Sequence, residues 1–93
     1  MAEFLVEMYV AQDDHETARQ QAERSERAAA AVSREDCVVR CVRSIYVPED
    51  ETCFLLFVAP SVEAVRSVMA LAGLRHEHIS TASSPVPRPL GGV

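Results

Sequence analysis

The stretch ETCFLLFVAPS, residues 51–61, contains eight consecutive apolar residues from Cys53 to Pro60. A strand that buries one face alternates apolar with polar residues, so an unbroken run predicts a strand with apolar side chains on both faces. Alternation divides these side chains between the two faces: Cys53, Leu55, Phe57 and Ala59 on one, and Phe54, Leu56 and Val58 on the other. Each face therefore needs something to cover it.

The segments before this strand predict a strand, a helix and a second strand. EFLVEMYV, residues 3–10, alternates with one fully apolar face, which is typical of a strand. Asp13, followed three residues later by Glu16, predicts the N-cap of a long helix rich in Ala, Glu, Gln and Arg. Residues 37–47 are rich in β-branched side chains, and the acidic turn PEDET joins them to residues 53–59 as a β-hairpin.

The segments after this strand predict a helix and a short last strand. Ser61 is a typical N-cap for a helix at residues 62–72, and Gly73 supplies a stop of the Schellman type at its C-terminus. HEHISTAS, residues 76–83, predicts the last strand.

This order of elements, βαββαβ, predicts an α+β domain of ferredoxin-like fold over residues 1–82. In that fold a four-stranded antiparallel sheet carries both helices on one face. Residues 83–93 contain three of the five prolines and predict a Pro/Gly-rich flexible tail.

Composition and charge narrow the range of partners. The chain has 93 residues, a formal net charge of −5, and nine cationic residues that are all arginine. The arginines are scattered, which argues against a nucleic acid or an anionic membrane as a partner. The sequence contains no apolar stretch long enough to cross a bilayer and no basic n-region of a signal peptide, so we expect a cytoplasmic protein. The bias to arginine and alanine is typical of a bacterial genome of high GC content.

The face of the sheet away from the helices would expose Phe54, Leu56 and Val58. Soluble monomers rarely leave such a patch uncovered. Covering three side chains of this size stabilises a protein by several kcal/mol, at about 25 cal/mol per Å². We therefore expect a homodimer stacked sheet to sheet through this face, which makes a dimeric α+β barrel. The alternative is a one-sided sheet that the chain's own tail covers.

The same face carries polar residues that predict a small-ligand site. With the hairpin turn centred on Asp50, Val47 lies opposite Cys53, and alternation then brings five polar residues to this face: Glu7, Tyr9, Arg40, Ser44 and Tyr46. An apolar surface with a few convergent polar groups is typical of a small-molecule site, although an ion pair and interface anchors would have the same composition. Arg43 would point into the core in this register, so we expect a bulge or a register shift beside it.

The chain lacks the motifs of nucleophilic catalysis and of nucleotide binding. It has only three glycines, so we expect no phosphate-cradling loop and no nucleotide cofactor. The enzymatic hypothesis is cofactor-independent acid–base chemistry in the dimer cavity, as in a cyclase, an isomerase or a monooxygenase-like enzyme. Glu7 would then be the base, and Arg40 or Tyr46 would hold an enolate oxygen.

The spacing of cysteines and histidines limits metal binding. Cys37 and Cys41 are four residues apart on a strand, which is about 13 Å and too far to share an ion. Cys53 is remote from both, so we expect three reduced thiols that pack as small hydrophobic residues. His76 and His78 share one face of a strand at about 7 Å and predict a metal site that a carboxylate or a second copy completes. Solvated histidines are the alternative.

Part of the chain resembles a known family. YVPEDETCFLLFVAPSVEAVRSVMALAGLRHEHI, residues 46–79, and to a smaller degree EFLVEMYV, are similar to a small actinobacterial family of unknown function and ferredoxin-like fold that includes a described nickel-binding protein. The hairpin acids, the apolar strand and the short motifs APS, AVR and AGL carry the resemblance. It implies a dimeric protein that binds nickel or a related divalent ion.

Three functional hypotheses remain open at this point: a metal- or small-ligand-binding accessory protein, a cofactor-independent enzyme, and a structural interaction module. Metal binding requires converging imidazole or thiolate atoms. Enzymatic work requires an enclosed space beside Glu7 and Arg40, and an interaction module requires neither.

Overall fold

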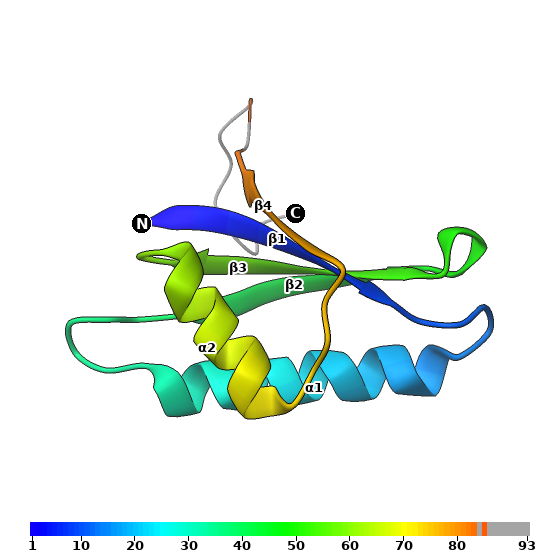
Figure 1. Ribbon diagram of the computed structural model, residues 1–93, viewed down its shortest axis with the longest axis horizontal. Helices are drawn as coiled ribbons and strands as arrows, with labels where there is room; N and C mark the ends of the chain where they lie inside the picture. Colours follow the sequence, from blue (N-terminus) through cyan, green and yellow to red (C-terminus); the bar gives the residue numbers. More distant parts are fainter. Residues whose placement is uncertain (84, 86–93) are drawn as a thin grey trace.

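A computed structural model describes residues 1–83 and 85, and its elements follow the predicted order (Figure 1). The strands are β1 (Ala2–Tyr9), β2 (Arg40–Val47), β3 (Thr52–Ala59) and β4 (His78–Ala82), and the helices are α1 (His15–Val32) and α2 (Val62–Ala72). The strands pair antiparallel in the order β2-β3-β1-β4. The predicted α+β ferredoxin-like fold is confirmed. The predicted tail lies, except for Ser83 and Pro85, outside the described residues.

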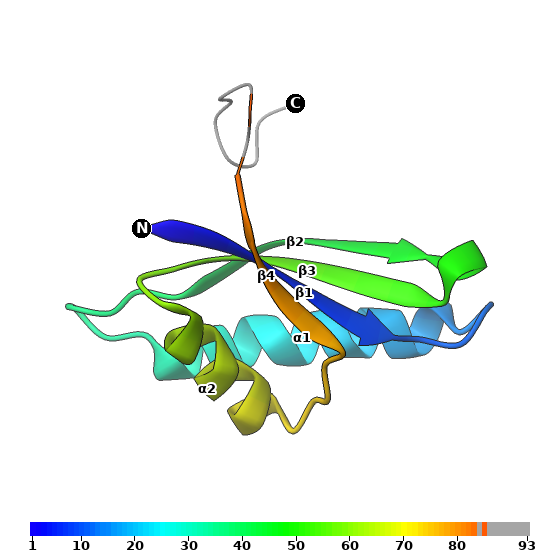
Figure 2. The ribbon, with the colours of Figure 1, turned by 45° about the horizontal axis from the view of Figure 1, so that its top comes forward.

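Both helices lie on one side of the sheet, as Figures 1 and 2 show. The side of β3 predicted to face the helices is buried to 1% exposure or less at Cys53, Leu55, Phe57 and Ala59. The apolar face of β1 is buried with it, at Phe4, Val6 and Met8. One core therefore fills the space between the sheet and the helices. Within the described part of the chain, neither helix has the length and apolar character needed to cross a membrane.

Helix α1 begins one residue later than predicted. The carboxylate of Asp14, not Asp13, caps it by accepting a hydrogen bond from Thr17 N at 3.1 Å. Asp13 has a φ of 67°, in the left-handed region that aspartate tolerates better than most residues. The buried residues of the helix are all small: Ala18, Ser25, Ala28 and Ala29. The helix therefore contributes little apolar area to the core.

Helix α2 has the ends that the sequence predicts. Ser61 Oγ accepts a hydrogen bond from Ala64 N at 3.3 Å, and the helix stops at Gly73, which has a φ of 68°. Leu74 N then donates to Met69 O at 3.0 Å, which is the 6→1 hydrogen bond of a Schellman motif. Arg24 on α1 also donates to the carbonyl of Ala72, so the two helices are linked at this end.

The β2–β3 hairpin differs from the predicted register by one residue. A 3₁₀ turn at Pro48–Asp50 is followed by Glu51 in the left-handed region, at a φ of 48°. The turn therefore uses four residues, and Val47 pairs with Thr52 instead of the predicted Cys53.

Strand β2 also begins later than predicted, at Arg40. Arg34 and Cys37 pair with each other in the preceding turn, through hydrogen bonds of 2.9 and 3.1 Å. Ser33 Oγ then accepts from Val39 N at 2.9 Å. These local bonds satisfy the backbone that the extended strand would have paired.

Candidate functional site

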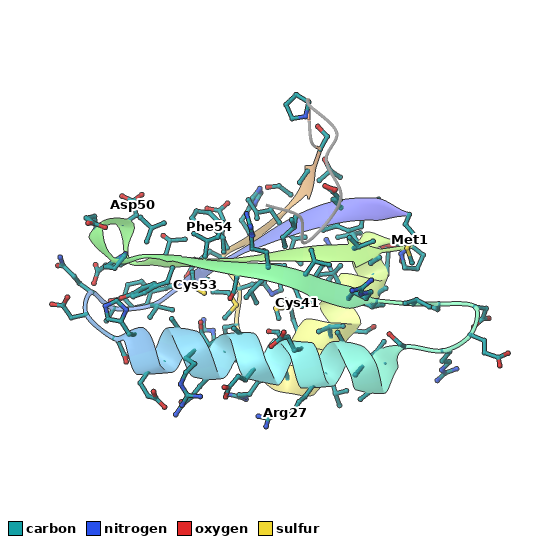
Figure 3. The ribbon with its side chains drawn as sticks, turned by 180° about the vertical axis from the view of Figure 1, so that it is seen from behind. Met1, Arg27, Cys41, Asp50, Cys53 and Phe54 are labelled. Atoms are coloured by element: carbon teal, nitrogen blue, oxygen red, sulfur yellow. The ribbon has the colours of Figure 1, made fainter. Side chains whose placement is uncertain are left out.

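The candidate site lies on the side of the sheet opposite the helices, which we call the open face. Residues that pair directly across antiparallel strands share a face, so the register arranges the open-face side chains in rows that cross β2, β3, β1 and β4. The rows are Arg40, Val58, Glu3 and Ala82; Arg43, Leu56, Leu5 and Ser80; Ile45, Phe54, Glu7 and His78; and Val47, Thr52 and Tyr9. Figure 3 shows Phe54 on this side of the sheet, with Cys41 and Cys53 on the helix side.

The centre of the open face is apolar. Phe54, Leu56 and Leu5 lie side by side there and are partly exposed. Ile45 at one side is 47% exposed, although it is a large apolar residue. The predicted uncovered patch is therefore present within a single chain.

Glu7 and His78 form a direct cross-strand pair at one side of this apolar centre. Such a pair places the two Cβ atoms about 5 Å apart, so the carboxylate and the imidazole can contact the same ligand. The backbone beside the pair is held by a hydrogen bond from Glu77 N to Glu7 O at 2.8 Å. The sequence placed Glu7 here but not His78 beside it, because the pairing of β1 with β4 cannot be read from either strand alone.

Tyr9 lies at the end of the same strand, as predicted for the site, and is 58% exposed. Its hydroxyl donates to Glu51 Oε2 at 3.3 Å, and the Glu51 carboxylate raises the pKa of Tyr9. A small hollow of about 140 Å³ lies between this pair and Glu7, and Glu77 forms another part of its wall. Tyr9 therefore borders the Glu7–His78 pair instead of joining it.

The predicted placement of Ser44 and Tyr46 on the open face is wrong. A bulge between Cys41 and Arg43, which was expected beside Arg43, adds one residue to β2. Between the bulge and the turn, where Val47 pairs with Thr52 instead of the predicted Cys53, Ser44 pairs with Leu55 and Tyr46 with Cys53, so both side chains lie on the helix side of the sheet. There Tyr46 donates to the carbonyl of Ala11, and its ring meets the His15 ring edge to face at a centroid distance of 5.1 Å.

The shifted register of the hairpin brings Arg43 and Ile45 to the open face in their place, and the bulge returns Arg40 to that face. The sequence missed both, although the conflict at Arg43 was the signal that could have found them. Arg40 is on the open face as predicted, but it pairs with Val58, at the opposite corner from Glu7. One chain therefore does not bring together Glu7, Arg40 and Tyr46, the set that the enzymatic hypothesis requires.

Of the two predicted metal-binding histidines, only His78 lies in a strand. His76 precedes β4, and both side chains are exposed. Among residues 1–83 and 85, no group of three or more histidine, cysteine, aspartate or glutamate residues is placed to hold a metal ion. A metal at His78 would therefore need ligands from a second copy or from water.

The three cysteines are free thiols. Cys41 and Cys53 both lie on the helix side of the sheet, four rungs apart along β3, since Cys41 pairs with Phe57. Burial raises the pKa of both thiols, and for Cys41 burial and the nearby Glu26 carboxylate raise the pKa to about 12. These are properties of structural thiols rather than of metal ligands or nucleophiles.

A groove lies between α1 and the edge strand β2, and Ser44 and Tyr46, which the prediction placed on the open face, line it. One part, of about 380 Å³, is lined by His15, Ser44, Tyr46 and Glu26 among others. A second part, of about 280 Å³, continues past Glu26 to Cys41 and Ser33. The groove exists because the alanines of α1 are too short to reach the sheet at its edge.

Comparisons with known proteins support the fold. No family model matches the chain, and no curated protein matches it. Among solved structures, a crystal structure of SCO4226 from Streptomyces coelicolor A3(2) is similar, with a TM-score of 0.57 and 22% sequence identity. The match covers 94% of this chain and 100% of that one. At this identity the likeness shows a shared fold alone.

Proposed function

We propose that two copies of the chain stack open face against open face, and that the interface holds a small ligand beside Glu7 and His78. The protein would then be a dimeric ligand-binding accessory protein. The observation that carries this proposal is the row in which a carboxylate and an imidazole stand next to Phe54, at the side of an apolar surface that the helices leave uncovered.

The size of the open face is compatible with a dimer. Three strands of eight residues and the five-residue β4, at about 3.3 Å per residue and about 4.8 Å between strands, give a face of roughly 460 Å². Two such faces bury about 920 Å² before the relief of the side chains is counted, which is close to the lower limit of specific interfaces. The second copy therefore supplies the cover that Phe54, Leu56 and Leu5 lack.

The residues around the pair define the class of ligand. Glu7 accepts hydrogen bonds or balances a positive charge, and His78 donates or accepts depending on its protonation. The neighbouring Phe54 and Ile45 offer apolar contact. The best fit is a small molecule with an apolar body and one polar end that carries a donor.

A divalent metal ion is the second candidate, and the same pair favours it. Carboxylate oxygen and imidazole nitrogen are common ligands of nickel, zinc and copper. One chain supplies Glu7 and His78, and a second copy or water would complete the coordination. Nickel is the ion that the family resemblance implies.

Native mass spectrometry of untagged protein tests both candidates, with and without added nickel, zinc and copper. We expect a dimer in every sample. A bound metal that is lost in Glu7→Gln and in His78→Ala, but kept in the control His15→Ala on α1, would support the metal site. A metal-free dimer would exclude that candidate and leave the small-molecule site, which a ligand screen by thermal shift then tests. A monomer at micromolar concentration would contradict the proposed function as a whole.

The ligand screen on the dimer also bears on the two other hypotheses, the cofactor-independent enzyme and the interaction module. Cofactor-independent catalysis requires that Glu7 meet a cationic partner, which one chain does not provide. A dimer that binds no ligand in the screen would favour a purely structural module.

A further inference from the structure

We propose that the two copies align their strands about a two-fold axis that runs parallel to the strands, so that Glu3 and Glu7 on β1 of one copy lie one strand to the side of Arg40 and Arg43 on β2 of the other. This inference rests on the proposed function, because it presupposes the homodimer. It adds the arrangement of the partner and the residues that select it.

The charges on the open face are divided between strands. Glu3 and Glu7 lie on β1, and Arg40 and Arg43 lie on β2, with the uncharged side chains of β3 between them. Both arginines are exposed, and no ion pair involves any of the four within residues 1–83 and 85. Each copy thus carries an acidic strand and a basic strand whose charges are unpaired within the part of the chain that the structure describes.

An axis parallel to the strands places β2 of the second copy over β4, and β3 of the second copy over β1. Arg40 of the second copy then lies in the same row as Glu3 but is displaced sideways by one strand, which is about 4.8 Å. The two sheets are themselves about 10 Å apart. Arg43 of the second copy lies between Glu3 and Glu7. Arginine side chains are long enough to cover these separations, and the two-fold axis repeats each contact. The axis also places Glu3 and Glu7 one strand to the side of the same residues of the other copy, so the arginines of both copies lie beside the glutamates and balance their charge.

The same axis also matches the apolar residues. Leu56 and Leu5 pair within one chain, so the axis places Leu56 of each copy over Leu5 of the other. Sheets that pack face to face with nearly aligned strands usually cross at about 30°, which changes these positions by little near the axis.

The other aligned arrangement has its axis perpendicular to the strands. It places β1 over β1 and β2 over β2, so that Glu7 of the second copy approaches Glu3 and Glu7 of the first. The arginines would likewise face each other. Like charges at close range in an interface are unfavourable, and here the nearest arginine strand of the other copy lies two strands, about 9.6 Å, to the side of these glutamates, instead of one strand as for the parallel axis. The perpendicular arrangement is therefore disfavoured.

Charge reversal distinguishes the two arrangements. The variants are Glu3→Arg/Glu7→Arg, Arg40→Glu/Arg43→Glu, and the four-residue exchange that combines both, each checked for folding by circular dichroism. The measurement is the dimer dissociation constant by sedimentation equilibrium at low salt. For the parallel axis, each double variant raises the constant about 100-fold, because acidic now faces acidic or basic faces basic. The exchange variant returns it to within about tenfold of the wild type.

The control is Glu35→Arg/Asp36→Arg, which changes the net charge by the same amount as Glu3→Arg/Glu7→Arg but lies in the exposed connection before β2. It should leave the dissociation constant unchanged. A mixture of wild type and the exchange variant gives a second readout. The parallel axis predicts few mixed dimers, and the perpendicular axis predicts that mixed dimers dominate.

The outcomes separate this inference from the proposed function. A wild-type dimer that the double variants leave intact, or that forms mostly mixed dimers with the exchange variant, overturns the arrangement and leaves the dimer standing. A monomeric wild type overturns both.

Discussion

The thiol of Cys41 lies between β2 and α1, where burial and the Glu26 carboxylate raise its pKa to about 12. A cysteine in water titrates near 8.5, so the thiol of Cys41 stays protonated at neutral pH while an ordinary cysteine begins to ionise. Cys41 is accordingly a packing residue. The same shift makes the free energy of unfolding depend on pH.

The direction of that dependence follows from proton binding. The folded state keeps the Cys41 proton to a higher pH than the unfolded state, so its contribution to stability is complete below about pH 8.5 and is lost as the pH rises toward 12. We expect the urea midpoint of the wild type to fall between pH 8 and pH 10.5, and that of Cys41→Ala to fall less. Parallel curves for the two proteins would contradict this assignment.

At the scale of elements, the turn and the bulge in β2 together decide which of its side chains lie on the helix side and which lie on the open face. Val42 is the extra residue, because Cys41 pairs with Phe57 and Arg43 with the next residue, Leu56. Removing it would leave a regular ladder in which every other β2 side chain keeps its face.

Two single-residue deletions test this account of the bulge. We expect deletion of Val42 to preserve the fold with a loss of stability of about 1–2 kcal/mol, a typical cost of one substitution. Deletion of Ser44 would instead make Arg43 pair with Leu55 and face α1, so it should unfold the protein or lower its stability by a larger amount. Urea denaturation of both variants is the measurement, and equal losses would show that the bulge does not set the faces.

The elements themselves were predictable from the sequence because their signals are local. The Ser61 cap, the Gly73 stop and the alternation of β1 each depend on neighbouring residues, and the structure confirms them. The register of β2 was not predictable, because it depends on a left-handed residue at Glu51 and on the bulge at Val42. The turn reverses the faces of the residues between it and the bulge, and for this reason Ser44 and Tyr46 were misplaced. The bulge reverses the faces again, so Arg40 lies on the predicted face.

At the scale of the whole molecule, the order of the elements and the ferredoxin-like fold of the chain were predicted correctly, and the candidate site was predicted in part. Glu7 and Arg40 lie on the open face as expected, because β1 alternates strictly and Arg40 precedes the bulge. The open-face positions of His78 and Arg43 became known only from the structure, through the pairing of β1 with β4 and of β2 with β3. Long-range pairing, which no local pattern encodes, accounts for the difference.

The proposed dimer predicts that thermal stability depends on protein concentration. Because dissociation accompanies unfolding, the melting temperature of the wild type should rise with protein concentration. Leu56→Gln removes an apolar contact at the centre of the proposed interface and should abolish that concentration dependence while the monomer stays folded. Differential scanning calorimetry between about 5 and 500 μM measures this. A melting temperature that is independent of concentration in the wild type would argue against the dimer.

The position of Glu51 has a consequence for the order of folding events. Its carboxylate accepts hydrogen bonds from Tyr9 and from Gln12 N, and its carbonyl accepts one from Val10 N, so it joins segments about 40 residues apart. The β2–β3 hairpin can form locally, but these three bonds close only when β1 has docked. If docking follows the transition state, Glu51→Gly, which keeps the left-handed turn and removes the carboxylate, will speed unfolding and leave the refolding rate unchanged in stopped-flow measurements. Glu51 would then slow unfolding and so set the lifetime of the native state.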